Sequence, residues 1–154
     1  MFMIEKKLLE LGIILPVPPK PAGSYIPVVI SDQLAFVSGQ IPVKDGQVVY
    51  QGKVASQQSI ENAQNAAKLC IINGLSQLNS QFGTLENLEK IIKISGFVNS
   101  DDGFTDQPKV INPASDLLVD IFGDKGKHSR IAVGVSSLPL NATIEIDMIV
   151  EIKG

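Results

Sequence analysis

Two oppositely charged residues near the C-terminal end, Arg130 and Glu145, have the types and the setting that chemistry on a small anion needs. Both lie in segments where apolar residues alternate with other types, which is typical of β-strands. If Ile131, Val133 and Val135 face a helix-covered core, Arg130 points to the other face of the sheet, and Glu145 lies on the corresponding face of the partner strand. A guanidinium binds a carboxylate through two parallel hydrogen bonds, and a glutamate transfers protons. The pair therefore indicates a binding site for a small acid.

A structural alternative is an ion pair between Arg130 and Glu145 that holds subunits in register. On a subunit-facing side of a sheet, an unpaired charge costs several kcal/mol. The two residues therefore either pair with each other or line a wet pocket, and the sequence leaves both alternatives open.

Four other residues have side chains or positions that a site could use. Gly39 follows a strand, where it allows a ligand close to the backbone or marks a bulge. Tyr25 follows a proline-rich stretch and is either a pocket wall or an interface aromatic. His128 lies in a polar loop without a recognisable Ser or Cys partner, which favours a solvated side chain over a catalytic one. Cys70 falls near the apolar stripe of a long helix and indicates core packing.

The elements that must position these residues follow from periodicity and from start and stop signals. We expect, in order, an N-terminal helix over about 1–12, a proline-rich connector over about 16–22, short strands over 28–30 and 34–38, a turn at 45–46, a long helix over 59–82, a strand over 91–98, a helix that starts at Asn112-Pro113 and ends near 122, and a closing pair of strands over 130–135 and 144–150.

This order of elements predicts an α+β fold, a single sheet with its helices on one face. In the segments 34–37 and 91–98, both alternating faces carry apolar residues, so the sheet face without helices also needs a cover. Another copy of the chain is the simplest cover. We expect a homo-oligomer with the sheets turned inward.

Composition narrows the class of protein. The 154 residues suit a single domain over 1–154, and the net charge of −3 gives no general attraction for nucleic acid. One cysteine and one histidine exclude an intrachain disulfide and a soft-ligand metal site within one chain. There is no apolar run of membrane-spanning length, and the charged start is unlike a signal peptide. We expect a cytoplasmic protein with no membrane partner.

Two groups of residues resemble a known family. They are Phe36-Val37-Ser38-Gly39-Gln40-Ile41-Pro42 and the closing run Arg130-Ile131-Ala132-Val133-Gly134-Val135 with Leu138-Pro139 and Ile144-Glu145-Ile146. They resemble the reactive-intermediate deaminase family, called RidA or YjgF-type and formerly endoribonuclease L-PSP, from about Pro21 to Ile152. The N-terminal helix and the longer 99–104 loop are similar to a longer branch of that family.

The resemblance implies a chorismate-mutase-like α+β fold and a homotrimer with ligand clefts between subunits. It implies that Arg130 grips a substrate carboxylate and that Glu145 positions a water. The substrate-binding positions implied by the same match are Tyr25, Gly39, Ser115 in place of an asparagine, Ala132 in place of a cysteine, and Pro139.

The activity that the resemblance implies is hydrolysis of enamine or imine intermediates of the 2-aminoacrylate type to a 2-keto acid and ammonia. No metal or cofactor is expected, because a pocket that positions water and stabilises charge is sufficient for such substrates. One alternative is a trimer that binds small carboxylates or ketoacids without turnover. A third hypothesis, endoribonuclease activity, agrees poorly with the acidic composition.

Overall fold

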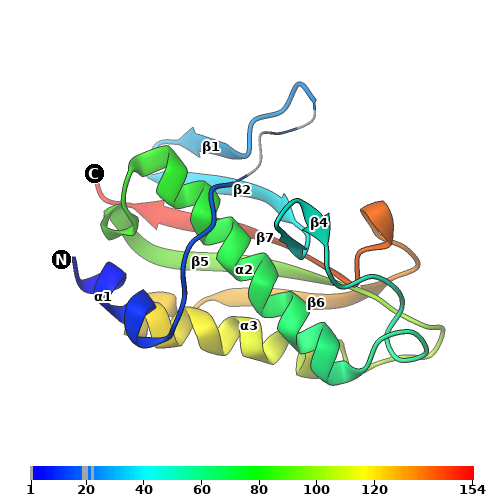
Figure 1. The fold of residues 1–154 in the computed structure, drawn as a ribbon. Helices are drawn as coiled ribbons and strands as arrows, with labels where there is room; N and C mark the ends of the chain where they lie inside the picture. Colours follow the sequence, from blue (N-terminus) through cyan, green and yellow to red (C-terminus); the bar gives the residue numbers. More distant parts are fainter. Residues whose placement is uncertain (1, 19–20, 22) are drawn as a thin grey trace.

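A five-stranded sheet with its helices on one face forms the centre of the molecule (Figure 1). The computed structural model describes residues 2–18, 21 and 23–154. The sheet has the strand order β1-β2-β7-β5-β6, and β3 and β4 form a separate hairpin. The strands are β1 Val28–Ser31, β2 Leu34–Gln40, β3 Val43–Lys44, β4 Gln47–Val48, β5 Leu88–Asn99, β6 Ser129–Val135 and β7 Ile144–Ile152. The α-helices are α1 Met3–Glu10, α2 Ile60–Phe82 and α3 Gln107–Phe122. The predicted α+β class and the helices on one face are confirmed.

Helix α2 begins and ends where the sequence signals place it. The Ser59 side chain accepts a hydrogen bond from the Asn62 backbone N–H at 3.0 Å, which caps the first turn. Gly83 ends the helix with φ of 76°, a left-handed conformation that glycine adopts without a steric penalty. The predicted helix over 59–82 is confirmed.

Helix α3 begins earlier than predicted. It starts at Gln107, with a proline in its first turn, and Pro113 lies inside it. Proline lacks an N–H, so the carbonyl of Lys109, four residues earlier, has no partner within the helix. The side-chain amide of Gln64 on α2 replaces the missing helical donor, because it donates a hydrogen bond to the Lys109 carbonyl at 2.9 Å. The interpretation of Asn112-Pro113 as a helix start was wrong because a neighbouring helix supplies the missing hydrogen bond.

Strands β6 and β7 are not the closing pair that we predicted. β5 lies between them, pairing parallel with β6 and antiparallel with β7. Helix α3 connects β5 to β6, so these three elements form a β-α-β unit, which requires parallel strands. Sequence neighbours therefore do not pair here, and β6 becomes an edge strand.

The apolar residues of β6 also face the side opposite to the predicted one. Ile131 and Val133 are 42% and 40% exposed, whereas Ala132 between them packs against the core. They point to the sheet face that no helix covers, which we call the open face. In β7 the prediction was right, since Ile144 and Ile146 are buried under the helices. The alternation of residue types correctly predicted that β6 is a strand. It did not predict which side chains face the helices, because both faces of this strand carry apolar residues.

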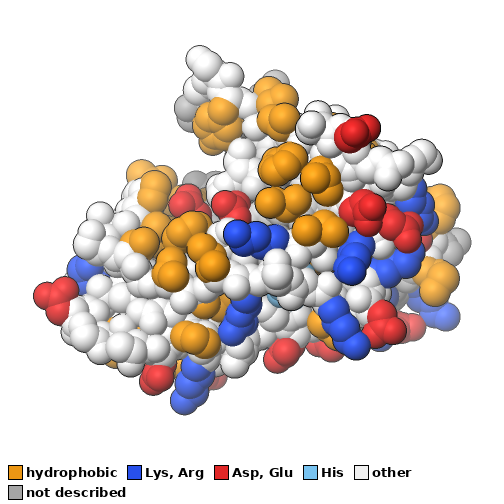
Figure 2. Space-filling view, turned by 180° about the vertical axis from the view of Figure 1, so that it is seen from behind, with side chains coloured by type: hydrophobic (Ala, Val, Ile, Leu, Met, Phe, Trp, Pro, Cys, Tyr) orange, Lys and Arg blue, Asp and Glu red, His pale blue; other side chains and the backbone are white. Residues whose placement is uncertain are grey.

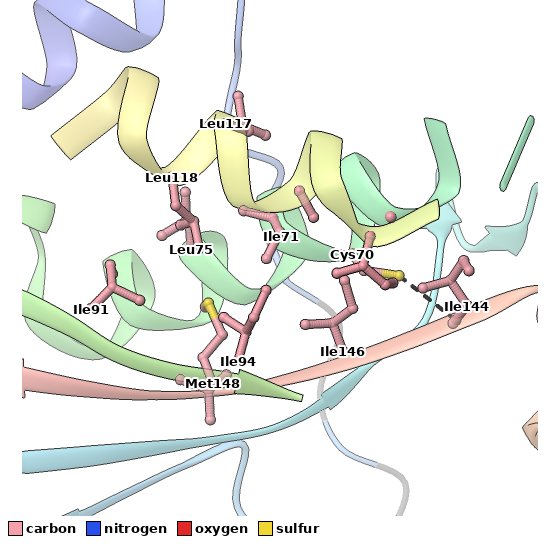
Figure 3. Close-up of a cluster of buried hydrophobic side chains, with 14 of the residues drawn as sticks. Cys70, Ile71, Leu75, Ile91, Ile94, Leu117, Leu118, Ile144, Ile146 and Met148 are labelled. Carbon is pink, nitrogen blue, oxygen red and sulfur yellow. Dashed lines mark hydrogen bonds between the residues drawn. The ribbon is translucent and has the colours of Figure 1, made fainter. Parts of the chain in front are cut away.

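The core lies between the two long helices and the sheet. Side chains of α2 and α3 pack onto those of β5 and β7, as Figure 3 shows. The fully buried members of this layer include Ile71, Leu75, Leu118, Ile94 and Ile146.

Cys70 belongs to this core, as its position in the sequence predicts. Its thiol is buried and donates to the Ile144 carbonyl at 3.7 Å (Figure 3). Burial, with a smaller contribution from the charge of Glu145, raises the pKa of the thiol well above its ordinary value. Because only the thiolate reacts, we expect modification by a water-soluble disulfide reagent to be at least about a thousandfold slower in the native protein than in denaturant. Fast native labelling, monitored by absorbance, would contradict this buried position.

The N-terminal segment packs onto the helical side of the fold. Helix α1 lies within the predicted range, and its Leu8 is buried. Residues 11–18, which we call the strap, run across the outer side of α2 (Figure 1). The described part of the predicted connector has no regular structure, and residues 19, 20 and 22 of that connector lie outside the described residues. Within the described chain, every helix is too short or too polar to span a bilayer.

Candidate functional site

Arg130 is held in place by α3 and not by a carboxylate. Its Nη2 donates to the Asn112 side-chain oxygen at 2.7 Å and to the Pro108 carbonyl at 3.3 Å. Its Nη1 donates to the Ser115 hydroxyl at 3.1 Å. All three acceptors are neutral, and the ion pairs among the described residues involve only lysines as cations. The guanidinium is therefore oriented while its positive charge stays available to an anion.

Ser115 connects Arg130 to His128. The His128 ring lies with Nε2 at 2.9 Å from the Ser115 hydroxyl and with Nδ1 at 2.6 Å from the Gly126 carbonyl. A carbonyl only accepts, so Nδ1 carries a proton and donates it to the Gly126 carbonyl, and Nε2 lies within hydrogen-bond distance of the Ser115 hydroxyl. A lone pair of the same hydroxyl then faces Arg130. His128 is half-buried within this network, so the prediction of a solvated loop histidine was wrong.

Asn112 is a site residue that the sequence analysis missed as such. It was interpreted only as a helix cap, although it makes the shortest contact of Arg130. One signal was available, since Asn112 and Ser115 are three residues apart and therefore share one face of a helix.

Glu145 lies on the open face next to Gly39. β2 has a bulge between Val37 and Gln40, and Gly39 lies in it. A Cβ at Gly39 would lie 2.9 Å from Cδ of Glu145, so only glycine leaves the carboxylate in its present position. Partial burial, together with the charge of Asp147, raises the pKa of Glu145 above that of an ordinary glutamate. Such a carboxylate is suited to taking up and returning a proton.

One chain does not bring Arg130 and Glu145 together. Arg130 is opposite Ile94 on β5, whereas Glu145 is opposite Phe97 on the same strand. Three residues along the strand and two strand spacings separate their Cα atoms by about 14 Å. Arg130 turns toward α3, and Glu145 lies on the open face. The prediction that both side chains share one face of the sheet was therefore wrong, and Arg130 and Glu145 do not pair within one chain.

Of the other predicted site residues, two lie near Arg130 and two lie in exposed segments away from it. Ser115 contacts Arg130 directly, and Ala132 lies on the same side of β6. Tyr25 is 57% exposed, in a segment that runs beside the end of β2, where the Ser38 N–H donates to the Pro27 carbonyl at 2.9 Å. Pro139, which is exposed, begins the short turn that leads into β7.

The open face is apolar over much of its area. Figure 2 shows orange side chains gathered in groups on this face, with charged side chains between them. A depression of about 380 Å³ lies among them, with Lys93 and Asp147 in its lining. Among the described residues, no cluster of His, Cys, Asp and Glu side chains could hold a metal ion. The large exposed apolar residues of the face include Val29, Phe36, Ile131 and Val133.

A sheet with this strand order, helices on one face and an apolar open face defines an α+β protein of the chorismate-mutase-like class. The family model described as "YjgF/chorismate mutase-like, putative endoribonuclease" matches residues 5–152, and the chain belongs to this family. Protein TCP17 of Trypanosoma cruzi is 37% identical over 151 residues, which are 97% of this chain and 94% of that protein.

Two solved structures are similar over nearly the full chain. Atu1372 from Agrobacterium tumefaciens is 43% identical with a TM-score of 0.92, covering 98% of this chain and 93% of that one. A protein from Shewanella oneidensis with the same endoribonuclease designation is 30% identical with a TM-score of 0.93, covering 97% and 99%. At this coverage the N-terminal segment belongs to the shared fold, in agreement with the predicted longer branch.

The contact between Gly39 and Glu145 can be tested by a double-mutant cycle. Gly39→Ala places a methyl group against the carboxylate, and we expect it to lower the free energy of unfolding by about 1–2 kcal/mol. In a Glu145→Ala background the obstructing side chain is gone, so the same change should cost less than about 0.5 kcal/mol. Urea unfolding of the four proteins measures both values. Equal costs in the two backgrounds would show that Gly39 is required for another reason.

Proposed function

We propose that the protein hydrolyses reactive enamines and imines of small 2-amino acids to 2-keto acids and ammonia, in a cleft shared by two copies of the chain. The observation that carries this proposal is the guanidinium of Arg130, which is oriented by three neutral acceptors and is not neutralised by a carboxylate. A fixed cation of this kind favours a ligand with a carboxylate group.

The reaction needs only positioning and one proton carrier. Arg130 binds the substrate carboxylate and so fixes the neighbouring imine carbon, after an enamine has taken a proton on its terminal carbon. Water adds to the C=N bond while the Glu145 carboxylate accepts a proton from it and passes the proton to the nitrogen. The resulting carbinolamine loses ammonia and leaves the C=O bond of the keto acid. The raised pKa of Glu145 brings it closer to neutrality, where such a transfer is efficient.

Two copies are required because the two residues lie on different faces of one sheet. The apolar open face favours a cover, and the resemblance to the deaminase family implies a homotrimer. In our proposal Arg130 of one chain faces Glu145 and Gly39 of its neighbour. Tyr25 and Pro139, both exposed in the single chain, supply further walls of the cleft.

A second candidate is a trimer that binds small carboxylates or ketoacids without turnover. The environment of Arg130 favours it specifically, because every side-chain contact of the guanidinium is neutral and no base of the same chain contacts it among the described residues. This candidate requires Arg130 but not Glu145.

The test uses an imino acid generated by an amino-acid oxidase, with catalase present, and follows the loss of the imine with and without the protein. We expect Arg130→Ala and Glu145→Gln each to lower the rate strongly. When the two variants are refolded together, about a quarter of the interfaces regain both native residues, and a similar share of the wild-type rate should return. A mixture no faster than its two components would contradict the shared cleft.

The same assay separates the two candidates. Binding of a ketoacid by wild-type protein, without any rate above the spontaneous one, would support the binding protein and reject the deaminase. Incubation of the same preparation with RNA tests the nuclease activity that the family description names.

The pH dependence of the reaction should report Glu145. The base works only when ionised, so the rate falls as the pH drops through the raised pKa, and the acidic limb lies above that of an ordinary glutamate. The raised pKa also means that folding favours the protonated form, so the contribution of Glu145 to stability is lost as the pH rises through it. Rate profiles and thermal unfolding against pH check both effects. Glu145→Gln should remove this pH dependence from both measurements.

A further inference from the structure

A groove of about 670 Å³ lies on the helical side of the fold, away from the open face. The strap forms one side of it with Leu11 and Ile13, and α2 forms its floor with Leu69 and Ile72. Val49, after β4, closes the far side. The volume is within the range of small-molecule sites.

The groove is apolar where a surface helix is ordinarily polar. The inner face of α2 packs on the sheet, so its outer face would normally carry polar side chains. Leu69 and Ile72 instead remain half-buried there, and Leu117 of α3 extends the same surface. Leu11 and Val49 at the rim are 38% and 45% exposed, so the strap covers this surface only in part.

Two lysines give the groove a positive charge. Lys44 on β3 and Lys68 on α2 both line it, and no acidic side chain is among its lining residues. Neither lysine takes part in an ion pair among the described residues. The whole chain has a net charge of −3, so this local positive charge is contrary to the overall balance.

We propose that this groove binds an amphipathic carboxylate, a molecule with one acid group and a medium-length acyl chain. The acyl chain lies along the apolar floor, and the carboxylate is placed between Lys44 and Lys68. The charge of the groove is complementary to such a ligand, and its volume of about 670 Å³ exceeds what a short 2-keto acid would fill. This site uses neither Arg130 nor Glu145 and is independent of the proposed deamination.

Three probes with the same tail distinguish the head groups: decanoate and decyltrimethylammonium, titrated calorimetrically below their micelle concentrations, and decanol, titrated below its solubility limit. We expect decanoate to bind most tightly and the cation most weakly. Lys44→Gln with Lys68→Gln should weaken decanoate binding roughly tenfold and leave decanol unchanged. Lys90→Gln, an exposed lysine outside the groove, is the matched control and should change nothing.

Val49→Trp tests the location, because its larger ring fills the groove and should weaken both decanoate and decanol. Val49 is 45% exposed and lies at the rim of the groove, so the change should leave the melting temperature nearly unaltered. The chain has no tryptophan, so the introduced indole also reports occupancy by fluorescence. The proposal is overturned if wild-type protein binds no decanoate, if decanoate and the cation bind equally, if the lysine double variant keeps wild-type affinity, or if Val49→Trp leaves binding intact.

Discussion

Replacing Arg130 by alanine is expected to lower kcat/KM for imino-acid hydrolysis by about 100-fold or more, so that the observed rate approaches the spontaneous one. The reason is geometric as well as electrostatic. The guanidinium is held by the oxygens of Asn112, Ser115 and Pro108, so it meets a carboxylate in a fixed orientation. Arg130→Lys keeps the charge but loses the planar fork, and it should recover only a small part of the rate. Steady-state kinetics with an oxidase-generated imino acid measures both.

The control for Arg130 is a cation outside this network. Lys125 forms a surface ion pair with Glu89 at 3.3 Å, so Lys125→Ala should keep the full rate. Arg130→Ala should also stay folded, because its lost contacts are to neutral and partly exposed groups. A folded Arg130→Ala protein with wild-type kinetics would remove Arg130 from the site.

Gly126→Ala is expected to lower the free energy of unfolding by about 3 kcal/mol, the largest stability effect we predict. A Cβ at Gly126 would overlap the Leu118 carbonyl oxygen and would lie 2.9 Å from Cα of Val119. These are backbone atoms of α3, so no side-chain rotation relieves the overlap. Where the backbone angles suit alanine and the space is free, Gly→Ala is stabilising, so a large loss of stability would identify the overlap. Thermal and urea unfolding measure it.

Lys127→Ala is the matched control for Gly126. This neighbouring residue is exposed and makes only a surface ion pair with Asp124, so its loss should change stability by less than about 0.5 kcal/mol. If Gly126→Ala melted within a degree or two of the wild type, the close packing of this turn on α3 would be disproved.

Local signals predicted the elements whose ends have local causes. Ser59 caps the start of α2 through a hydrogen bond, and Gly83 ends the helix through its left-handed backbone angles. Both effects involve only residues close by in the sequence. Asp45 and Gly46 both adopt positive φ in the hairpin turn between β3 and β4, as their types indicate. In β7, one face is clearly apolar and the other carries Glu145 and Asp147, so alternation also gave the correct direction.

Nonlocal arrangements were beyond such signals. The facing of β6 depends on which side α3 covers, and the strand itself is apolar or small on both sides. The pairing of β5 with both β6 and β7 follows from the crossover through α3, which no single segment encodes. Ser115, which the resemblance to the deaminase family implies as a substrate-binding position, contacts Arg130 in the structure. The resemblance did not reveal that His128 completes this network, because that contact depends on the turn through Gly126.

The proline within α3 has a consequence for how the two long helices are assembled. The Lys109 carbonyl accepts a hydrogen bond from the Gln64 side chain, so this pair links the registers of the two helices. A slip of α2 by one turn would move that amide by about 5 Å, and the exposed Lys109 carbonyl would then exchange its protein donor for water. Apolar side chains tolerate many offsets between two helices, whereas this polar contact forms at one offset only. The proline in α3 thus frees a carbonyl whose contact with Gln64 favours one alignment of the two long helices.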